Sequence, residues 1–520
     1  MNALVPLVVV IPLVGAALAL ILGKRPRAQR AVTILALAVV LVVGTVLLIA
    51  VDSTGVLVMD VGGWAAPFGI VLLVDRLSAL MVIVSAIVLL AVFLFSVGQG
   101  FADGDEETPV SIFYPTYLIL ATGVFNAFIA GDLFNLYVGF EILLVSSYVL
   151  ITLGGTEQRI RAGTTYIVVS LVSSVLFLAA IAMIYGALGT VNIAQISVRM
   201  AEIPVDVQNL LHVCLLLAFG IKAAVFPLSF WLPDSYPTAP APVTAVFAGL
   251  LTKVGVYSII RAETVIFPGP QLNTALLIVA LLTMVVGVLG AVSQADIKRI
   301  LSFTLVSHIG YMILGIALGT AEGTGAAIYY IVHHIIVQST LFLATGLIER
   351  QGGTTSINKL GGMLAAAPVI AMLFFVPALN LGGIPPFSGF IGKLALFEAT
   401  AQQGSWLGYV LIGAGALVSL LTLYALVRVW NMVFWRKASE VEGYESPLLT
   451  NVSEAPFATT RADTREIPRL MIGATAALVA VSLALTVFAG PLYAMAARAG
   501  ENLEGPSYYV DAVFPGGIND

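Results

Sequence analysis

Residues 132–150 read DLFNLYVGFEILLVSSYVL, an apolar stretch that begins with Asp132, is long enough to cross a bilayer and has a second carboxylate, Glu141, at its centre. Ionisable groups inside such stretches are costly and usually have a function. Three lysines have the same setting: Lys222 in LLLAFGIKAAVFPLSFWLPD, Lys253 in TAVFAGLLTKVGVYSIIR and Lys393 in GGIPPFSGFIGKLALFEA. The pattern predicts a membrane protein that keeps charged groups inside its spans.

The composition agrees with this prediction. The 520 residues are 60% hydrophobic and 10% charged, whereas soluble chains average roughly 25% charged residues. The net charge of -5 predicts no nucleic-acid partner. The single cysteine, Cys214, excludes a disulfide framework, and no dinucleotide fingerprint, HExxH spacing or haem-ligand pair occurs. We therefore expect no cofactor and no electron transfer by this chain.

The apolar segments predict an all-α polytopic membrane protein of about fourteen transmembrane helices, with strand content near zero because open sheet edges cannot face lipid. We place the spans at roughly 3–22, 31–51, 70–98, 111–131, 133–153, 163–186, 208–229, 241–262, 272–292, 299–319, 325–348, 369–400, 406–435 and 469–497.

The distribution of basic residues tests this count, since cytoplasmic loops are rich in Lys and Arg. With the loop that carries Lys24 inside, the inner loops hold fifteen Lys and Arg, and the outer segments hold three. The inner set includes Arg159, Arg161, Lys298, Arg350, Arg461 and Arg465, and the outer set is Arg199, Arg261 and Arg498. Both termini are then predicted to face the outside.

Two spans contain helix breakers beside a lysine. Lys222 is followed by Pro227 and Pro233, while Lys393 is preceded by a run of Gly and Pro, comprising Gly382, Gly383, Pro385, Pro386 and Gly389. Broken helices at matching places in two halves indicate a transporter's ion site, although Gly and Pro are also simply frequent in membrane helices. Spans 4–8 and 9–13 would then be two inverted five-helix repeats. The expected division is 1–110, 111–262, 263–435 and 436–520, the last part holding a cytoplasmic connector, helix 14 and a short external tail.

The buried charges suggest how protons could move. Burial favours a neutral lysine and a nearby carboxylate favours a charged one, so a change in a Glu141–Lys222 pair could load or unload a proton. The alternative for each group is a snorkelling side chain or a structural ion pair.

The histidines and the remaining acids have open roles. His308 and His334 could relay protons, or could be neutral and hydrogen-bonded between helices. His333 and His334 are adjacent, so at most one is expected to face the same path, while Tyr330, His334 and Gln338 share a helix face. His212 is expected to be structural. Asp132 and Asp234 suit a helix-end role and a transport role equally.

At these residues the sequence resembles the antiporter-like subunits shared by respiratory complex I and the multisubunit Na+/H+ antiporters of the Mrp type. The matching strings are NLYVGFEILLVSSYVLI (135–151), the run from Gly220 to Arg261, SQADIKRILSFTLVSHIGYM (293–312) and GGIPPFSGFIGKLALFEA (382–399). GDLFNLYVGFEI (131–142) and YGALGTVNIAQIS (185–197) are most like the D-type subunits of the antiporters. The resemblance implies fourteen helices with inverted repeats, and it implies that Glu141, Lys222, Lys253 and Lys393 match the family's proton-path residues, with Lys393 terminal.

The resemblance also implies a function. We expect a non-enzymatic, proton-translocating subunit of a monovalent cation (Na+)/H+ antiporter, with other antiporter subunits as partners in a bacterial cell membrane. The alternatives are a proton-pumping subunit of a complex I-like NADH:quinone oxidoreductase and a passive channel. The residues do not reveal a site for Na+. Gln338 departs from the family, which often has lysine there, so His334 or water would bridge at that point.

Overall fold

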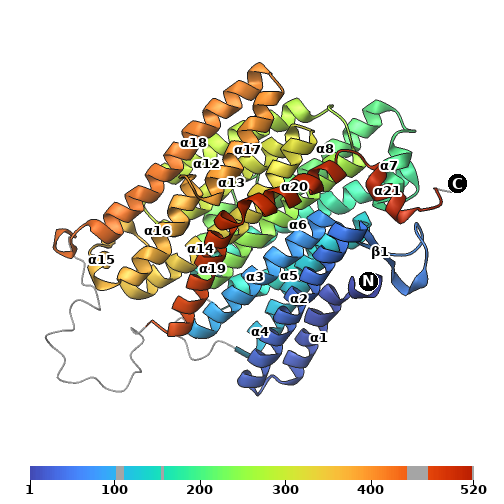
Figure 1. The fold of residues 1–520 in the computed structure, drawn as a ribbon. Coiled ribbons are helices and arrows are strands. Elements are labelled where there is room, and N and C mark those ends of the chain that lie inside the picture. Colours follow the sequence, from blue (N-terminus) through green and yellow to red (C-terminus); the bar gives the residue numbers. More distant parts are fainter. Residues whose placement is uncertain (101–109, 154–156, 442–466, 518–520) are drawn as a thin grey trace.

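The computed structural model of the chain describes residues 1–100, 110–153, 157–441 and 467–517, and it is a bundle of helices that lie lengthwise beside one another (Figure 1). Within these ranges, thirteen helical segments are long and apolar enough to cross a membrane. They are α1 (Leu7–Ile21) with the short turn η1 (Asn2–Leu4), α2 (Pro26–Thr54), α3 (Arg76–Gln99), α4 (Val110–Ile129), α5 (Leu133–Thr152), α6 (Glu157–Leu188), α8 (Val205–Ala223), the segment Ala241–Ile266, α12 (Asn273–Ser293), α13 (Ile297–Ala317), α14 (Ala321–Gly352), α18 (Trp406–Trp430) with η7 (Asn431–Trp435), and α19 (Arg469–Val487).

The remaining predicted span, 369–400, consists of two shorter helices, α16 (Pro368–Gly382) and α17 (Ser388–Gln402). Gly383 ends α16 with a φ of 81°, which glycine adopts without strain, and the prolines that follow lack the N–H that would continue a helix. In the seventh span, α8 ends at Ala223 and the chain is non-helical until α9 (Leu232–Ser235). Both predicted breaks are confirmed, and the broken pair completes the fourteen predicted crossings.

Two predicted helices are less regular than expected. The last one, 469–497, was expected to be continuous, but it is interrupted at Phe488, where α19 gives way to α20 (Ala489–Asn502). The eighth contains α10 (Ala241–Val246), a π-helical turn η4 (Phe247–Leu251), α11 (Thr252–Arg261) and a second π-helical turn η5 (Ala262–Ile266). Such wide turns often occur at functional sites, and η4 immediately precedes Lys253.

One antiparallel hairpin, β1 (Leu57–Asp60) with β2 (Val71–Val74), lies between α2 and α3. Its second strand occupies the start of the third predicted span, 70–98, which is helical only from Arg76. The strand content of the described residues is therefore small, as expected. The hairpin, the short helices α7 (Ile193–Met200) and α21 (Ser507–Val513), and both ends of the described chain gather at one end of the bundle (Figure 1). At the opposite end, α15 (Met363–Ala366) precedes α16.

A buried ion pair fastens α11 to the start of α3. Arg261 donates from its two terminal nitrogens to Asp75 at 2.6 and 2.7 Å, and both side chains are 4% exposed. Burial disfavours the Asp75 carboxylate, but the Arg261 guanidinium outweighs this and keeps the pKa of Asp75 below its usual value. Removing one partner of such a pair costs roughly 3–5 kcal/mol, so this contact ties the two elements together.

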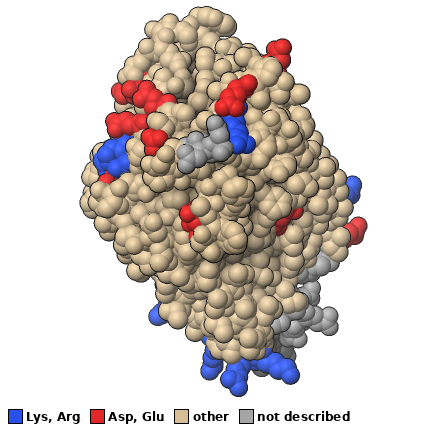
Figure 2. All heavy atoms as spheres, turned by 90° about the vertical axis from the view of Figure 1, so that its right-hand side faces the viewer, with Lys and Arg blue, Asp and Glu red and all other residues tan. Residues whose placement is uncertain are grey.

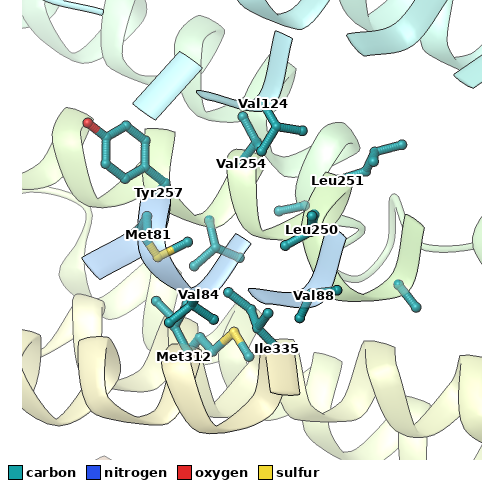
Figure 3. Close-up of a cluster of buried hydrophobic side chains, with 14 of the residues drawn as sticks. Met81, Val84, Val88, Val124, Leu250, Leu251, Val254, Tyr257, Met312 and Ile335 are labelled. Carbon is teal, nitrogen blue, oxygen red and sulfur yellow. The ribbon is translucent and has the colours of Figure 1, made fainter. Parts of the chain in front are cut away.

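Helix α3 also contributes to the apolar centre of the bundle. Figure 3 shows its side chains packed between those of α4, η4 and α11 on one side and those of α13 and α14 on the other; the labelled residues are Met81, Val84, Val88, Val124, Leu250, Leu251, Val254, Tyr257, Met312 and Ile335. The most apolar stretches of Ala241–Ile266 and of α14 are entirely buried. The elements that carry Lys253 and His334 are therefore central.

The charged surface residues are separated along the molecule. On the side drawn in Figure 2, most Asp and Glu lie in the upper part together with some Lys and Arg, a group of Lys and Arg lies at the lower edge, and few charged atoms lie between them. This arrangement suits a protein whose middle faces lipid.

Candidate functional site

All four predicted charged residues lie inside the bundle. Glu141 lies on α5, Lys222 in the last turn of α8, Lys253 on α11 and Lys393 on α17. The three lysines are 8%, 0% and 4% exposed, in that order. In the part of the chain that the structure describes, no lysine of this group has a carboxylate partner, and each Nζ donates to a backbone carbonyl inside the protein instead. None of them snorkels to the surface.

Lys222 lies beside α6 and near Glu141. Its Nζ donates to Ser174 Oγ at 3.1 Å and to the carbonyl of Ser170 at 3.3 Å, and it lies 5.6 Å from the ring centroid of Phe140. Glu141 and Lys222 interact electrostatically without a direct ion pair. The buried Oε1 of Glu141 has no hydrogen-bond partner among the described residues. The expected pair is thus close but not in contact.

A small cavity lies against Lys222. It has a volume of about 20 Å³, and Tyr166, Trp231 and Tyr236 contribute to its lining. A cavity of about 10–15 Å³ already suffices for one water molecule, provided that polar partners are present. The hydroxyl of Tyr236 is buried without a partner in the described chain, so the space beside Lys222 suits a hydrogen-bonded water.

Helix irregularities hold the other two lysines. Lys253 Nζ donates to the carbonyl of Ala248, in the π-helical turn η4, at 2.7 Å. Lys393 Nζ donates to the carbonyls of Leu381 and Gly382 at 3.0 and 3.4 Å, where α16 breaks, and to Ser419 Oγ at 2.8 Å. Carbonyls that a regular helix would have occupied are therefore available to stabilise an ammonium group.

Aromatic and imidazole rings lie between Lys253 and Lys393. The hydroxyl of Tyr330 and Nδ1 of His308 are 2.7 Å apart, and the rings of His308 and His334 are 5.3 Å apart. Both histidines interact electrostatically with Lys253 and with Lys393. The two nitrogens of His334 are buried without partners among the described residues. The structure brings the predicted relay residues together, and their role remains a prediction.

His333 belongs to the same group of residues, although we expected at most one of the adjacent histidines to face it. The rings of His333 and His334 both pack against Tyr330, with centroids 5.4 and 6.3 Å away. Nδ1 of His333 lies 2.9 Å from Ser388 Oγ, at the start of α17, and Asn380 Oδ1 accepts from the same hydroxyl at 3.2 Å. The polar residues in the broken span were the signal that could have pointed to this contact.

Residues at span ends have local roles. Asp132 caps α5 by accepting from the backbone N–H of Asn135 at 2.6 Å, and burial raises the pKa of Asp132 to about 6. Asp234 forms an exposed ion pair with Arg299 at 2.9 Å. His212 pairs with Glu263 at 2.5 Å and stacks on the ring of Phe267, as expected of a structural histidine. No group of three potential metal-ligating side chains occurs among the described residues.

Comparisons with known proteins agree with this geometry. Residues 130–422 match the family described as NADH:quinone oxidoreductase/Mrp antiporter, TM. The chain is 38% identical over 517 residues to the D-type subunit of the Na+/H+ antiporter of Alkalihalophilus pseudofirmus, with 99% of each chain covered.

Two solved structures have the same fold. A chain of the Mrp complex from Dietzia sp. DQ12-45-1b superposes with a TM-score of 0.88 at 32% identity and covers 99% of this chain and 100% of its own. A chain of respiratory complex I from Thermus thermophilus gives a TM-score of 0.73 at 24% identity, with 94% and 99% covered. This chain therefore belongs to the family of antiporter-like membrane subunits shared by NADH:quinone oxidoreductases and Mrp antiporters.

Proposed function

We propose that this chain is the proton-translocating subunit of a multisubunit Na+/H+ antiporter in a bacterial cell membrane, and thus a transporter rather than an enzyme. The observation that supports this best is the set of buried titratable residues without carboxylate partners, namely Lys222, Lys253, His334, His308 and Lys393, with the half-buried Glu141 near Lys222. The antiporter relative from Alkalihalophilus pseudofirmus and the Mrp complex support antiporter subunits as its partners. The complex I chain shares the fold at lower identity and so gives less support to the redox-pump alternative.

The mechanism follows from the contacts of the lysines. A buried ammonium is stable only where acceptors surround it, and each lysine has a carbonyl acceptor that also remains when the amine is neutral. Each lysine can therefore hold a proton or release it without a large rearrangement. Between Lys253 and Lys393, the Tyr330 hydroxyl and the His308 and His334 rings provide groups that both donate and accept. A change in the charge of Glu141 would change how readily Lys222, the first lysine of the path, binds or releases its proton.

We further propose that residues 111–262 and 263–435 are inverted repeats. Asp132 caps α5, and its backbone forms an isolated antiparallel β-bridge with that of Asn192, which follows α6. In the same way Asp296 caps α13, and its backbone forms a β-bridge with that of Ser356, which follows α14. Each acid thus begins the second helix of its unit, and each unit contains a break beside a lysine. Because each unit has an odd number of crossings, equivalent positions in the two units lie on opposite sides, which places the two acids at opposite ends of the bundle.

The proposed orientation has both termini outside the cell. In a Cys214→Ser background, a cysteine at Arg161 should react only with a reagent applied from the cytoplasm, and a cysteine at Glu202 only with one applied from outside. Both positions are exposed, so labelling of intact cells and of everted vesicles by an impermeant maleimide measures the topology directly. The opposite pattern would reverse the orientation. The proposed inner residues Arg461 and Arg465, and most of the connector 436–468, lie outside the described residues.

The function is tested in everted vesicles from an antiporter-deficient strain that expresses the complete set of antiporter subunits. We expect added Na+ to dissipate a respiration-generated pH gradient, and we expect no dissipation when this chain alone is omitted. A redox pump subunit would instead move protons with NADH oxidation and ignore Na+. A passive channel would collapse the gradient before Na+ is added.

A further inference from the structure

A cavity of about 610 Å³ opens at the end of the bundle that carries the start of α6, the linker between α9 and α10, and the start of α13. Its charged lining residues are Arg159, Lys298, Glu349 and Arg350. Under the proposed orientation this end faces the cytoplasm. The cavity is large enough for many water molecules, so its walls are in contact with the aqueous phase.

Lys298 is the buried charge of this cavity. The residue is 6% exposed, and its Nζ lies 2.8 Å from a carboxylate oxygen of Glu349, whose side chain is 41% exposed. A buried ammonium is thus paired with a carboxylate that is itself half-exposed and can move into water. Such a movement would leave the ammonium without its counter-ion, which favours release of its proton.

Lys298 also lies at one end of a line of polar groups between α13 and α14 that leads into the bundle, which we call the Gln338 seam. One turn deeper on α13, the carbonyl of Leu301 accepts from Gln338 Nε2 at 2.8 Å. Gln338 is fully buried, and its Oε1 has no partner among the described residues. Gln338 lies one turn from His334 on α14, and His334 faces His308 on α13. The same two helices therefore carry the cavity at one end and the histidines at their centre.

We propose that Lys298 is the residue through which protons leave the cytoplasmic cavity and join the buried path, and that Gln338 connects it to His334. The inference rests on the proposed proton transport. When Glu349 swings into solvent, the Lys298 ammonium releases one proton along the Gln338 seam and becomes a neutral amine. It then takes one proton from the cavity and regains Glu349, so each cycle moves one proton.

Lys298→Arg separates this role from a structural one. Arginine keeps the charge and the ion pair with Glu349, but a guanidinium does not release its proton in a protein. We expect Lys298→Arg to lower the rate of Na+-driven proton exchange about tenfold or more. Lys298→His keeps a titratable group, and we expect it to retain part of the rate with an optimum at lower pH. Arg299→Lys changes the exposed neighbouring residue and should leave the rate unchanged.

Gln338→Leu supplies a second variant, which we expect to slow exchange while the subunit still assembles. Assembly is measured by the amount of each variant in the purified complex. A wild-type rate in an assembled Lys298→Arg variant would overturn the proposal, as would a wild-type rate in an assembled Gln338→Leu variant if Lys298→Arg fails to assemble. Lys393→Ala is measured in parallel, because a wild-type rate there would instead refute the proposed function itself.

Discussion

Lys393→Ala is expected to lose nearly all Na+-driven proton exchange, whereas Lys393→Glu should retain part of it with a shifted pH optimum. The ammonium of Lys393 bridges the broken span, because its Nζ donates to Leu381 and Gly382 at the end of α16 and to Ser419 on α18. Alanine removes the proton carrier altogether. Glutamate keeps an ionisable group, but carbonyl acceptors can bond only to its protonated form, so its protonation follows a different pH dependence.

The measurement is Na+-dependent change of intravesicular pH, scanned over external pH for both variants. Lys359→Ala is the matched control, because Lys359 is an exposed lysine in the described chain and should tolerate the same change. A wild-type pH profile in Lys393→Ala would mean that the lysine only supports the structure at the break.

Glu141→Gln and Lys222→Ala should each reduce exchange about 100-fold or more while the complex still assembles. The glutamine substitution keeps the shape of Glu141 and removes only its charge, and therefore its electrostatic effect on Lys222. Because the two residues interact without direct contact, a charge-swapped pair is not expected to restore activity. If they act as one unit, the double variant should be no worse than either single variant.

Glu157→Gln provides the control for the first variant, since Glu157 is an exposed carboxylate at the start of α6. Exchange rates are compared at equal amounts of assembled complex. Near-normal exchange in either single variant contradicts the coupled role, and additive losses in the double variant would show that the two residues act separately.

The local chemistry of the chain was predictable from sequence because the bilayer leaves few alternatives. A span must be helical, about 20 residues long and almost free of charge, so the crossings, both breaks and the exceptional residues could be recognised one segment at a time. The exceptional residues are charged side chains in otherwise apolar segments, namely Glu141, Lys222, Lys253 and Lys393. The same reasoning missed the π-helical turn before Lys253, which contains no proline. It also missed the break at Phe488, although Pro491 lacks the N–H that would bond to the carbonyl of Val487, the last residue of α19.

Which side chains meet was decided only by tertiary structure. Sequence periodicity gives the face of one helix, but not the angle or height at which another helix crosses it. His333 therefore reaches Ser388, 55 positions away, and Lys393 lies against Ser419 on α18. For the same reason Glu141 and Lys222 interact without touching, and Lys298, which the sequence places in a loop, lies buried beside a cavity at one end of the bundle. The sequence by itself determined which ionisable groups enter the membrane, because insertion depends on the length and hydrophobicity of the segment that carries each group. The packing of distant helices determined which of those groups meet.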